Sequence, residues 1–185
     1  LLLFSFFILL QFKLLSIIIA LISMPLIIVY PFMKRYTYWP QLVLGITFNW
    51  GILIVSAEYI GGISFQAFLL YIACIFWTLG YDTIYAYQDK EDDIKSKLRS
   101  TAILFGKRGK IIVMFFYCSF VFFIFAAQNF TNFKFSNLII ILTLLLALLA
   151  LVNKWDIYSH KSSNYYFKLN NLIGLIFFLY LTLTN

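Results

Sequence analysis

The feature of this sequence that most constrains its fold is a series of long segments without a charged side chain. Most of these segments are about 17–23 residues long, which is the length that a helix needs to cross a bilayer. Hydrophobic residues make up 63% of the chain and charged residues only 11%, which excludes an ordinary soluble domain. The uncharged segments are 1–12, 14–33, 36–57, 59–81, 111–133, 135–153 and 169–185. The pattern predicts an all-α, polytopic transmembrane helical bundle, organised as a single domain over residues 1–185, with the lipid bilayer as its surroundings.

The first apolar run, 1–12, is too short to span a bilayer by itself. The sequence also lacks an initiator Met, and no charged region or small-residue cleavage site marks a signal peptide. We therefore expect six full spans and one truncated span, in a chain that continues a longer one.

The basic residues predict which side of the membrane each loop faces. If the spans alternate in direction, twelve of the fourteen Lys and Arg residues fall on one side, and only Lys13 and Lys134 fall on the other. The positive-inside rule then predicts that the side with twelve bases is cytoplasmic. The net charge of +7 is explained by this topology, so we expect no nucleic-acid partner.

A dense acidic cluster occupies residues 81–93 and holds five of the seven acidic residues of the chain. If this segment is helical, Asp82, Asp89 and Asp93 lie on nearly the same face. Carboxylates on one stripe repel each other unless a positive charge lies between them, so a divalent cation is the first hypothesis. The alternative is that the charged loop between two spans is merely solvated.

Basic residues next to this cluster favour a magnesium–diphosphate site. Lys97 and Arg99 follow the acidic residues closely, and Lys34 and Arg35 end another span on the same side. Mg²⁺ is commonly held by one or two carboxylates together with substrate phosphate. Lys and Arg then neutralise the remaining phosphate charge. Lys34 and Arg35 also fit a second interpretation, in which they only anchor the topology.

These residues match a known motif. The segment YDTIYAYQDKEDD (81–93), followed by KLRSTA (97–102), resembles the second aspartate-rich motif of the UbiA prenyltransferase family. The segments YPFMKR (30–35), GITFNWG (45–51) and STAILFG (100–106) are similar to the members of that family that prenylate 4-hydroxybenzoate in ubiquinone biosynthesis.

The resemblance implies a membrane enzyme of nine helices, with two aspartate-rich motifs facing each other across a cavity near the cytoplasmic side. Mg²⁺ between the motifs would hold the diphosphate of a polyprenyl donor, whose allylic cation alkylates 4-hydroxybenzoate ortho to its hydroxyl. The first motif, Asn-Asp-x-x-Asp-x-x-x-Asp, is absent from these residues. We therefore expect seven of the nine helices in this chain, and a place in the bacterial inner (plasma) membrane with the active site facing the cytoplasm.

The resemblance and the residue types together assign candidate roles. The catalytic and metal-binding candidates, through Mg²⁺–diphosphate, are Asp82, Asp89 and Asp93. Lys97 and Arg99 are candidates for phosphate contact, and Lys34 or Arg35 for holding the diphosphate or the benzoate carboxylate.

Two further candidates each have two interpretations. Asn49 either lines the substrate cavity or makes a hydrogen bond between helices. Tyr85, like Tyr81, either presents its ring face to a cation or packs in the core.

Three other functions stay open. The chain could be a family enzyme with another acceptor, such as a naphthoate, homogentisate or haem. It could be an inactive truncated remnant. It could also be an ion-coupled carrier, although carriers often have ionisable residues near mid-span, and the predicted spans carry essentially no internal charge.

Overall fold

The computed structural model describes residues 2–129 and 135–184, and every regular element in these two ranges is helical. This confirms the predicted all-α fold. The elements are α1 (Leu2–Leu9), α2 (Leu14–Val29), η1 (Tyr30–Phe32), α3 (Met33–Tyr36), α4 (Pro40–Phe48), α5 (Gly51–Ile60), α6 (Phe65–Gln88), α7 (Lys90–Lys95), α8 (Thr101–Phe105), η2 (Gly106–Arg108), α9 (Gly109–Asn129), α10 (Phe135–Lys154) and α11 (His160–Thr184).

Several of these helices are long and apolar enough to cross a membrane, as expected of a multi-pass membrane protein. In the described residues four stretches qualify, namely Leu14–Tyr36, Pro40–Ile60, Phe65–Gln88 and Thr101–Gln128. The sequence predicted two more full spans, 135–153 and 169–185. The corresponding helices are α10, whose apolar part Leu138–Lys154 is shorter, and α11, which has 25 residues.

The helix that carries Asp82 extends beyond the uncharged segment that ends at residue 81. A helical segment 81–93 was the hypothesis from the sequence, and α6 indeed continues past Asp82 to Gln88. The helix begins cleanly, because the Ser64 side chain accepts a hydrogen bond from the Ala67 N–H at its first turn. Asp82 is therefore part of a membrane-spanning helix rather than of the loop that follows it.

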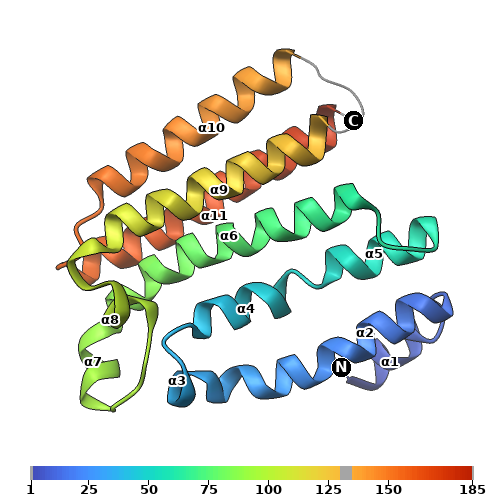
Figure 1. Ribbon diagram of the computed structural model, residues 1–185, viewed down its shortest axis with the longest axis horizontal. Coiled ribbons are helices and arrows are strands. Elements are labelled where there is room, and N and C mark those ends of the chain that lie inside the picture. Colours follow the sequence, from blue (N-terminus) through green and yellow to red (C-terminus); the bar gives the residue numbers. More distant parts are fainter. Residues whose placement is uncertain (1, 130–134, 185) are drawn as a thin grey trace.

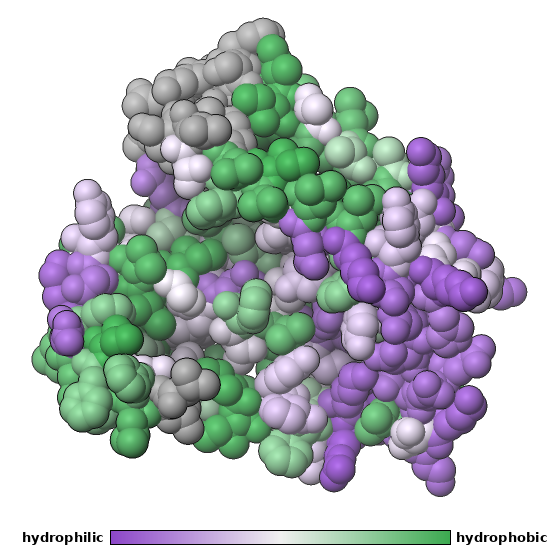
Figure 2. All heavy atoms as spheres, turned by 180° about the vertical axis from the view of Figure 1, so that it is seen from behind, coloured by the Kyte–Doolittle hydropathy of each residue, from purple (hydrophilic) through white to green (hydrophobic). Residues whose placement is uncertain are grey.

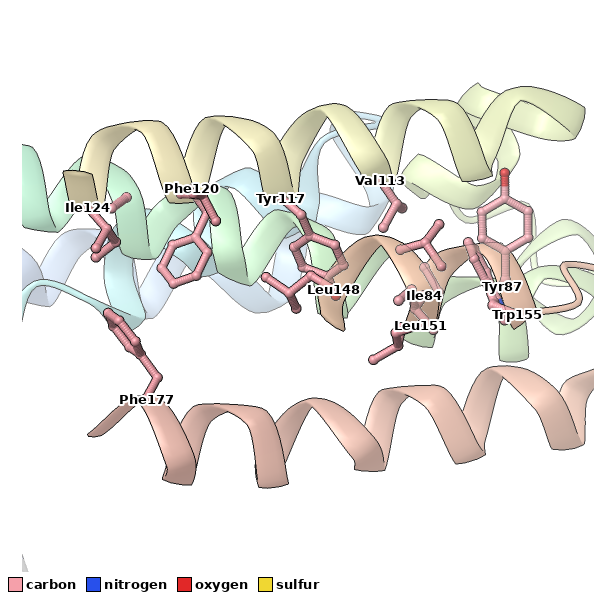
Figure 3. Close-up of a cluster of buried hydrophobic side chains, with 14 of the residues drawn as sticks. Ile84, Tyr87, Val113, Tyr117, Phe120, Ile124, Leu148, Leu151, Trp155 and Phe177 are labelled. Atoms are coloured by element: carbon pink, nitrogen blue, oxygen red, sulfur yellow. The ribbon is translucent and has the colours of Figure 1, made fainter. Parts of the chain in front are cut away.

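The core of the bundle is formed around α6, which packs most extensively against α9 and then against α11 and α4 (Figure 1). Figure 3 shows the larger of two buried clusters, in which α6, α9, α10 and α11 each contribute apolar side chains. Within it, the fully buried Tyr117 hydroxyl donates to the Asn170 side-chain oxygen at 2.8 Å. A second cluster joins α6 to α2, α5 and α9. Because α6 belongs to both clusters, its position is fixed from two sides.

A glycine lets α6 and α9 approach closely just before the acidic residues. A Cβ atom on Gly80 would lie only 2.3 Å from the Cε1 atom of Tyr117. Gly80 therefore leaves the space that the Tyr117 ring fills. This contact brings α6 and α9 close together two turns before α6 ends.

Most of the charged residues lie at one end of the bundle. This end, called the basic end below, contains the loops and short helices of residues 30–40, 88–109 and 154–160, and lies on the left in Figure 1. Figure 2 shows hydrophilic residues gathered there, while much of the remaining surface is hydrophobic. The opposite end contains the turns 10–13 and 61–64 with Lys13, whereas Lys134 lies outside the described residues. The helices thus bring together the bases that the sequence assigned to one side.

Candidate active site

The acidic segment bends at Asp89 instead of forming one continuous helix. α6 ends at Gln88, Asp89 has non-helical backbone angles (φ −93°, ψ 4°), and α7 begins at Lys90. The Asp93 N–H nevertheless donates to the Asp89 carbonyl oxygen at 2.9 Å, so that Asp93 follows one turn after Asp89. The predicted stripe of three carboxylates is therefore divided between two helices.

The carboxylate of Asp93 faces a lysine from a distant part of the chain. The Lys34 ammonium donates to both oxygens of this carboxylate, at 3.0 and 3.3 Å. The Asp93 side chain is 5% exposed and that of Lys34 37%. The structure thus joins α3 to α7 through an ion pair whose acidic partner is buried.

Asp82 and Asp89 form the other part of the site. Lys34 and Asp89 both lie close enough to Asp82 to interact with it electrostatically. The Tyr85 side chain interacts with Asp89 and with Lys34. The centre of its ring lies 4.9 Å from the centre of the Phe167 ring on α11. Two carboxylates, one ammonium and one phenol therefore gather where α6 reaches the basic end.

Arg99 is already engaged with the backbone and a ring of the neighbouring segment. Its N–H donates to the Lys34 carbonyl oxygen at 2.8 Å, and its guanidinium donates to the Tyr36 carbonyl oxygen at 2.6 Å. The guanidinium also lies 5.4 Å from the centre of the Tyr38 ring. Arg99 thus fastens the loop after α7 to the segment 34–38, in addition to its candidate role toward phosphate.

Two other candidate bases are free to meet a ligand. Lys97 and Arg35 are exposed, and neither side chain makes an ion pair with any described residue. Lys97 also has a positive φ of 53°, which is uncommon for a residue with a side chain. Both belong to the basic end, on the same side of the bundle as Asp89.

Asn49 makes the hydrogen bond between helices that was one of its two interpretations. Its side-chain amide donates to Thr78 on α6 at 2.9 Å and to the Gly45 carbonyl oxygen at 2.8 Å. It also borders an open groove of about 760 Å³ that extends to Leu70. Leu70 lies twelve residues before Asp82 on α6, or about 18 Å along the helix axis. The groove thus extends away from Asp82, whereas Thr78, the partner of Asn49, lies four residues or about one helical turn before Asp82 on α6.

Sequence reasoning missed a buried polar contact behind the acidic residues. Thr83 and Thr101 share a hydrogen bond of 3.0 Å, and the Thr101 N–H donates to the Gln41 side-chain oxygen at 3.2 Å. All three residues are at most 3% exposed. Their signal in the sequence is weak, since Gln41 is one polar residue in a long apolar run. The contact connects α4, α6 and α8 directly behind Asp82.

The sequence model of the UbiA prenyltransferase family matches residues 1–181. The chain belongs to this family. The resemblance that the motif at 81–93 suggested is thereby confirmed. A solved relative supports the fold: the apo structure of a UbiA homolog from Aeropyrum pernix K1 superposes with a TM-score of 0.71 at 19% sequence identity, covering 94% of this chain and 66% of that one.

Curated relatives share more sequence identity with the chain over part of its length. A 4-hydroxybenzoate geranyltransferase of Lithospermum erythrorhizon is 47% identical over 107 residues, which cover 57% of this chain and 35% of the relative. A 4-hydroxybenzoate octaprenyltransferase of Pseudomonas fluorescens is 53% identical over 85 residues (46% and 29%). A mitochondrial 4-hydroxybenzoate polyprenyltransferase of Aedes aegypti is 50% identical over 105 residues (56% and 24%). The chain thus spans about a third or less of the length of these relatives.

UbiA-family prenyltransferases generally depend on a divalent metal. In the described part of the chain, no group of three or more His, Cys, Asp or Glu side chains is placed to hold a metal ion. Mg²⁺, however, needs only one or two protein carboxylates when substrate phosphates supply the other ligands. Asp82, which interacts electrostatically with both Asp89 and Lys34, is compatible with such a site together with Asp89. Asp93, whose carboxylate is occupied by Lys34, fits it less well.

Proposed function

We propose that the protein transfers a polyprenyl group from polyprenyl diphosphate to the ring of 4-hydroxybenzoate, as a step of ubiquinone biosynthesis. The family match over residues 1–181 supports prenyl transfer, and the names of three relatives that are 47–53% identical support this acceptor. The observation that carries the proposal is the gathering of Asp82, Asp89 and Lys34 at the basic end of a bundle from this family.

In this proposal Asp82 and Asp89 hold Mg²⁺, which would neutralise charge on the diphosphate and so assist its departure. Lys97 and Arg35 are exposed at the same end, and their positive charges suit contacts with phosphate or with the benzoate carboxylate. Asp93 is proposed as a third metal ligand, and its carboxylate is paired with Lys34 in this structure.

The reaction breaks an allylic C–O bond and a ring C–H bond and forms one C–C bond. The allylic C–O bond breaks, and its electron pair leaves with the diphosphate. The ring carbon ortho to the hydroxyl then bonds to the allylic carbon, and that ring carbon loses its proton. The Tyr85 ring, which is 37% exposed and next to Asp89, is suited to face the cationic carbon. The apolar helices around the site would limit hydrolysis by water.

We also propose a location and a topology. The bases gathered at the basic end favour a cytoplasmic position for this end under the positive-inside rule. In a bacterium, the membrane would then be the inner membrane, with the active site open to the cytoplasm.

The proposal also requires a first aspartate-rich motif. The resemblance to the UbiA family implies that this motif faces the one at 81–93. The relatives are longer than the matched residues, which supports our proposal that residues 1–185 belong to a single prenyltransferase domain whose two N-terminal helices, with the first motif, lie in a longer protein. The coding sequence upstream of Leu1 tests this directly. A long open reading frame without such a motif would argue for an inactive remnant.

A membrane assay tests the function. Membranes that contain the full-length protein are incubated with Mg²⁺, a polyprenyl diphosphate and 4-hydroxybenzoate, and the prenylated acid is measured by mass spectrometry. We expect product that depends on added Mg²⁺ and is lost in Asp89→Asn. The matched control is Asp92→Asn, because Asp92 is 79% exposed and is in the same acidic segment. If product forms only with homogentisate or a naphthoate, the proposed acceptor is wrong. If no product forms with any acceptor, the proposed function is wrong.

A further inference from the structure

The corner of the bundle where α9 begins and α10 ends carries a cluster of bases. We call the following four residues the α9–α10 corner: Lys107, Arg108, Lys110 and Lys154. Within the described residues none of them makes an ion pair. The sequence has one acidic residue after Asp93, namely Asp156, and its carboxylate accepts the Tyr158 N–H at 3.0 Å. The corner therefore keeps a net positive charge.

Two sets of contacts hold this corner in place. The Tyr87 hydroxyl of α6 donates to the Gly106 carbonyl oxygen, just before the first base of the corner. The Tyr87 ring also packs edge-on against the fully buried Trp155 ring, with 5.0 Å between the ring centres (Figure 3). The Lys110 ammonium donates to the Asn153 carbonyl oxygen at 3.0 Å, which joins α9 to α10. The bases are thus attached to a fixed backbone, which lowers the entropy that a ligand must offset.

Next to these bases, one face of α9 is exposed and apolar. Ile111, Phe115 and Phe122 are each at least 60% exposed. Their spacing of four and seven residues places them along one side of the helix, called the apolar face 111–122 below. Lys107 lies in η2, which continues into α9 at Gly109, so this base is about one turn before Ile111. The corner therefore ends an apolar face that is exposed along a membrane-spanning helix.

We propose that the α9–α10 corner binds a phospholipid with an anionic head group. The phosphate of the head group meets the bases of the corner, and an acyl chain lies along the apolar face 111–122. Basic side chains between membrane helices suit anionic head groups, because the attraction acts at the membrane surface while the chains stay among apolar side chains. The inference concerns binding and does not depend on the proposed reaction.

One phospholipid satisfies both features of this surface, whereas other partners satisfy one. Free phosphate would neutralise the bases but leave the apolar face 111–122 uncovered. A second copy of this chain, inserted in the same direction, would cover that face but bring its own bases up to the corner, and like charges repel. The combination of unpaired bases and an adjacent apolar face therefore favours an anionic lipid.

A fluorescence experiment on the full-length protein tests this site. Phe115→Trp places a tryptophan on the apolar face, and Phe178→Trp, at a residue of α11 with the same 60% exposure, is the matched control. Each variant is reconstituted into phosphatidylcholine vesicles with either brominated phosphatidylglycerol or brominated phosphatidylcholine, because bromine quenches tryptophan fluorescence at contact. The unsubstituted protein supplies the signal of the native tryptophans. We expect phosphatidylglycerol to quench Phe115→Trp more strongly than phosphatidylcholine does, and both lipids to quench Phe178→Trp equally.

Charge substitutions then identify the residues that bind the head group. Arg108→Gln combined with Lys154→Gln should reduce the preference for phosphatidylglycerol at Phe115→Trp about tenfold or more, since each base near an anionic membrane contributes roughly fivefold. Lys95→Gln combined with Lys168→Gln, which removes one base each from α7 and α11, should leave the preference unchanged. Equal quenching by the two lipids at Phe115→Trp, or displacement of the lipid by excess inorganic phosphate, would overturn the proposal. So would a lack of quenching by either lipid, because another protein surface would then cover the apolar face.

Discussion

The two ends of the bundle each contain a contact between a lysine and an acidic residue, and the two contacts differ in burial. At the opposite end, the Lys13 N–H donates to the Glu58 carboxylate at 2.8 Å and its ammonium donates to the Glu58 carbonyl oxygen, in an exposed setting. At the basic end, Lys34 pairs with the buried carboxylate of Asp93. The first contact joins the start of α2 to the end of α5. The second lies beside two further carboxylates.

This difference shows why residue types alone do not identify a site. Glu58 accepts a hydrogen bond from the N–H of Lys13, the N-cap residue of α2, and an acidic side chain at a helix N-terminus is an ordinary arrangement. Asp82, Asp89 and Asp93 are too many carboxylates for Lys34 alone, and the remaining negative charge can attract a ligand cation. The number of acids around one base, together with their burial, distinguishes the candidate site from the helix cap.

The largest expected effect is a loss of prenylation activity from a substitution at the basic end, compared with no loss at the opposite end. Asp82→Asn removes one of the two proposed metal ligands, so we expect prenylation to fall by about a hundredfold or more, since charge stabilisation contributes several kcal/mol to such a reaction. Glu58→Gln at the opposite end should keep wild-type activity, because its contacts lie at the far end of α5. The measurement is product formation per mole of inserted protein. Normal turnover by Asp82→Asn would remove the acidic end of α6 from the mechanism.

The second prediction concerns packing at two glycines. In Gly80→Ala the new Cβ atom meets the buried Tyr117 ring at 2.3 Å, so we expect a loss of about 3 kcal/mol in the free energy of unfolding. In Gly62→Ala the Cβ atom has no neighbour within 4 Å, and the change should be within about 0.5 kcal/mol. Thermal denaturation in detergent measures both. Equal stability of the two variants would mean that α6 and α9 are not held together at Gly80.

The sequence predicted the helices well because hydropathy is a local property. Each apolar segment carries its own signal, and the motif at 81–93 identified the family that the comparison confirms. The break at Asp89 was not predicted. The hypothesis was a single helical segment over residues 81–93, but α6 ends at Gln88 and α7 begins at Lys90.

The contacts that define the candidate site could not be predicted from spacing. Lys34 and Asp93 are 59 residues apart, and Gln41 and Thr101 are 60 residues apart. The periodicity of residues within one helix cannot predict such pairs, since their contact depends on how α3, α4, α7 and α8 pack against one another. The same holds for Asn49 and Thr78, whose hydrogen bond joins residues that are 29 positions apart.

The third prediction compares the two lysines directly. Lys34→Met should lower the free energy of unfolding by about 2 kcal/mol, because it leaves the buried Asp93 carboxylate without its cation while nearby solvent offsets part of the cost. Lys13→Met should leave the unfolding midpoint nearly unchanged, since the hydrogen bond from the Lys13 backbone N–H to the Glu58 carboxylate is at the surface and does not need the lysine side chain. The measurement is thermal unfolding of both variants at low salt. A larger effect at Lys13 would reverse the comparison between the two ends.

The smallest expected effect distinguishes two roles of Arg99 within the basic end. Its guanidinium donates to the Tyr36 carbonyl oxygen and lies over the Tyr38 ring, so Arg99→Ala should cost about 1 kcal/mol of stability. If this anchoring is its main role, the KM for polyprenyl diphosphate should rise only about twofold to threefold, since about 0.5 kcal/mol corresponds to that change. Lys107→Ala, at an exposed base of the same end, controls for the loss of one positive charge. A tenfold rise in KM with unchanged stability would instead make Arg99 a phosphate ligand, and the basic end would then differ from the opposite end by ligand binding as well as by burial.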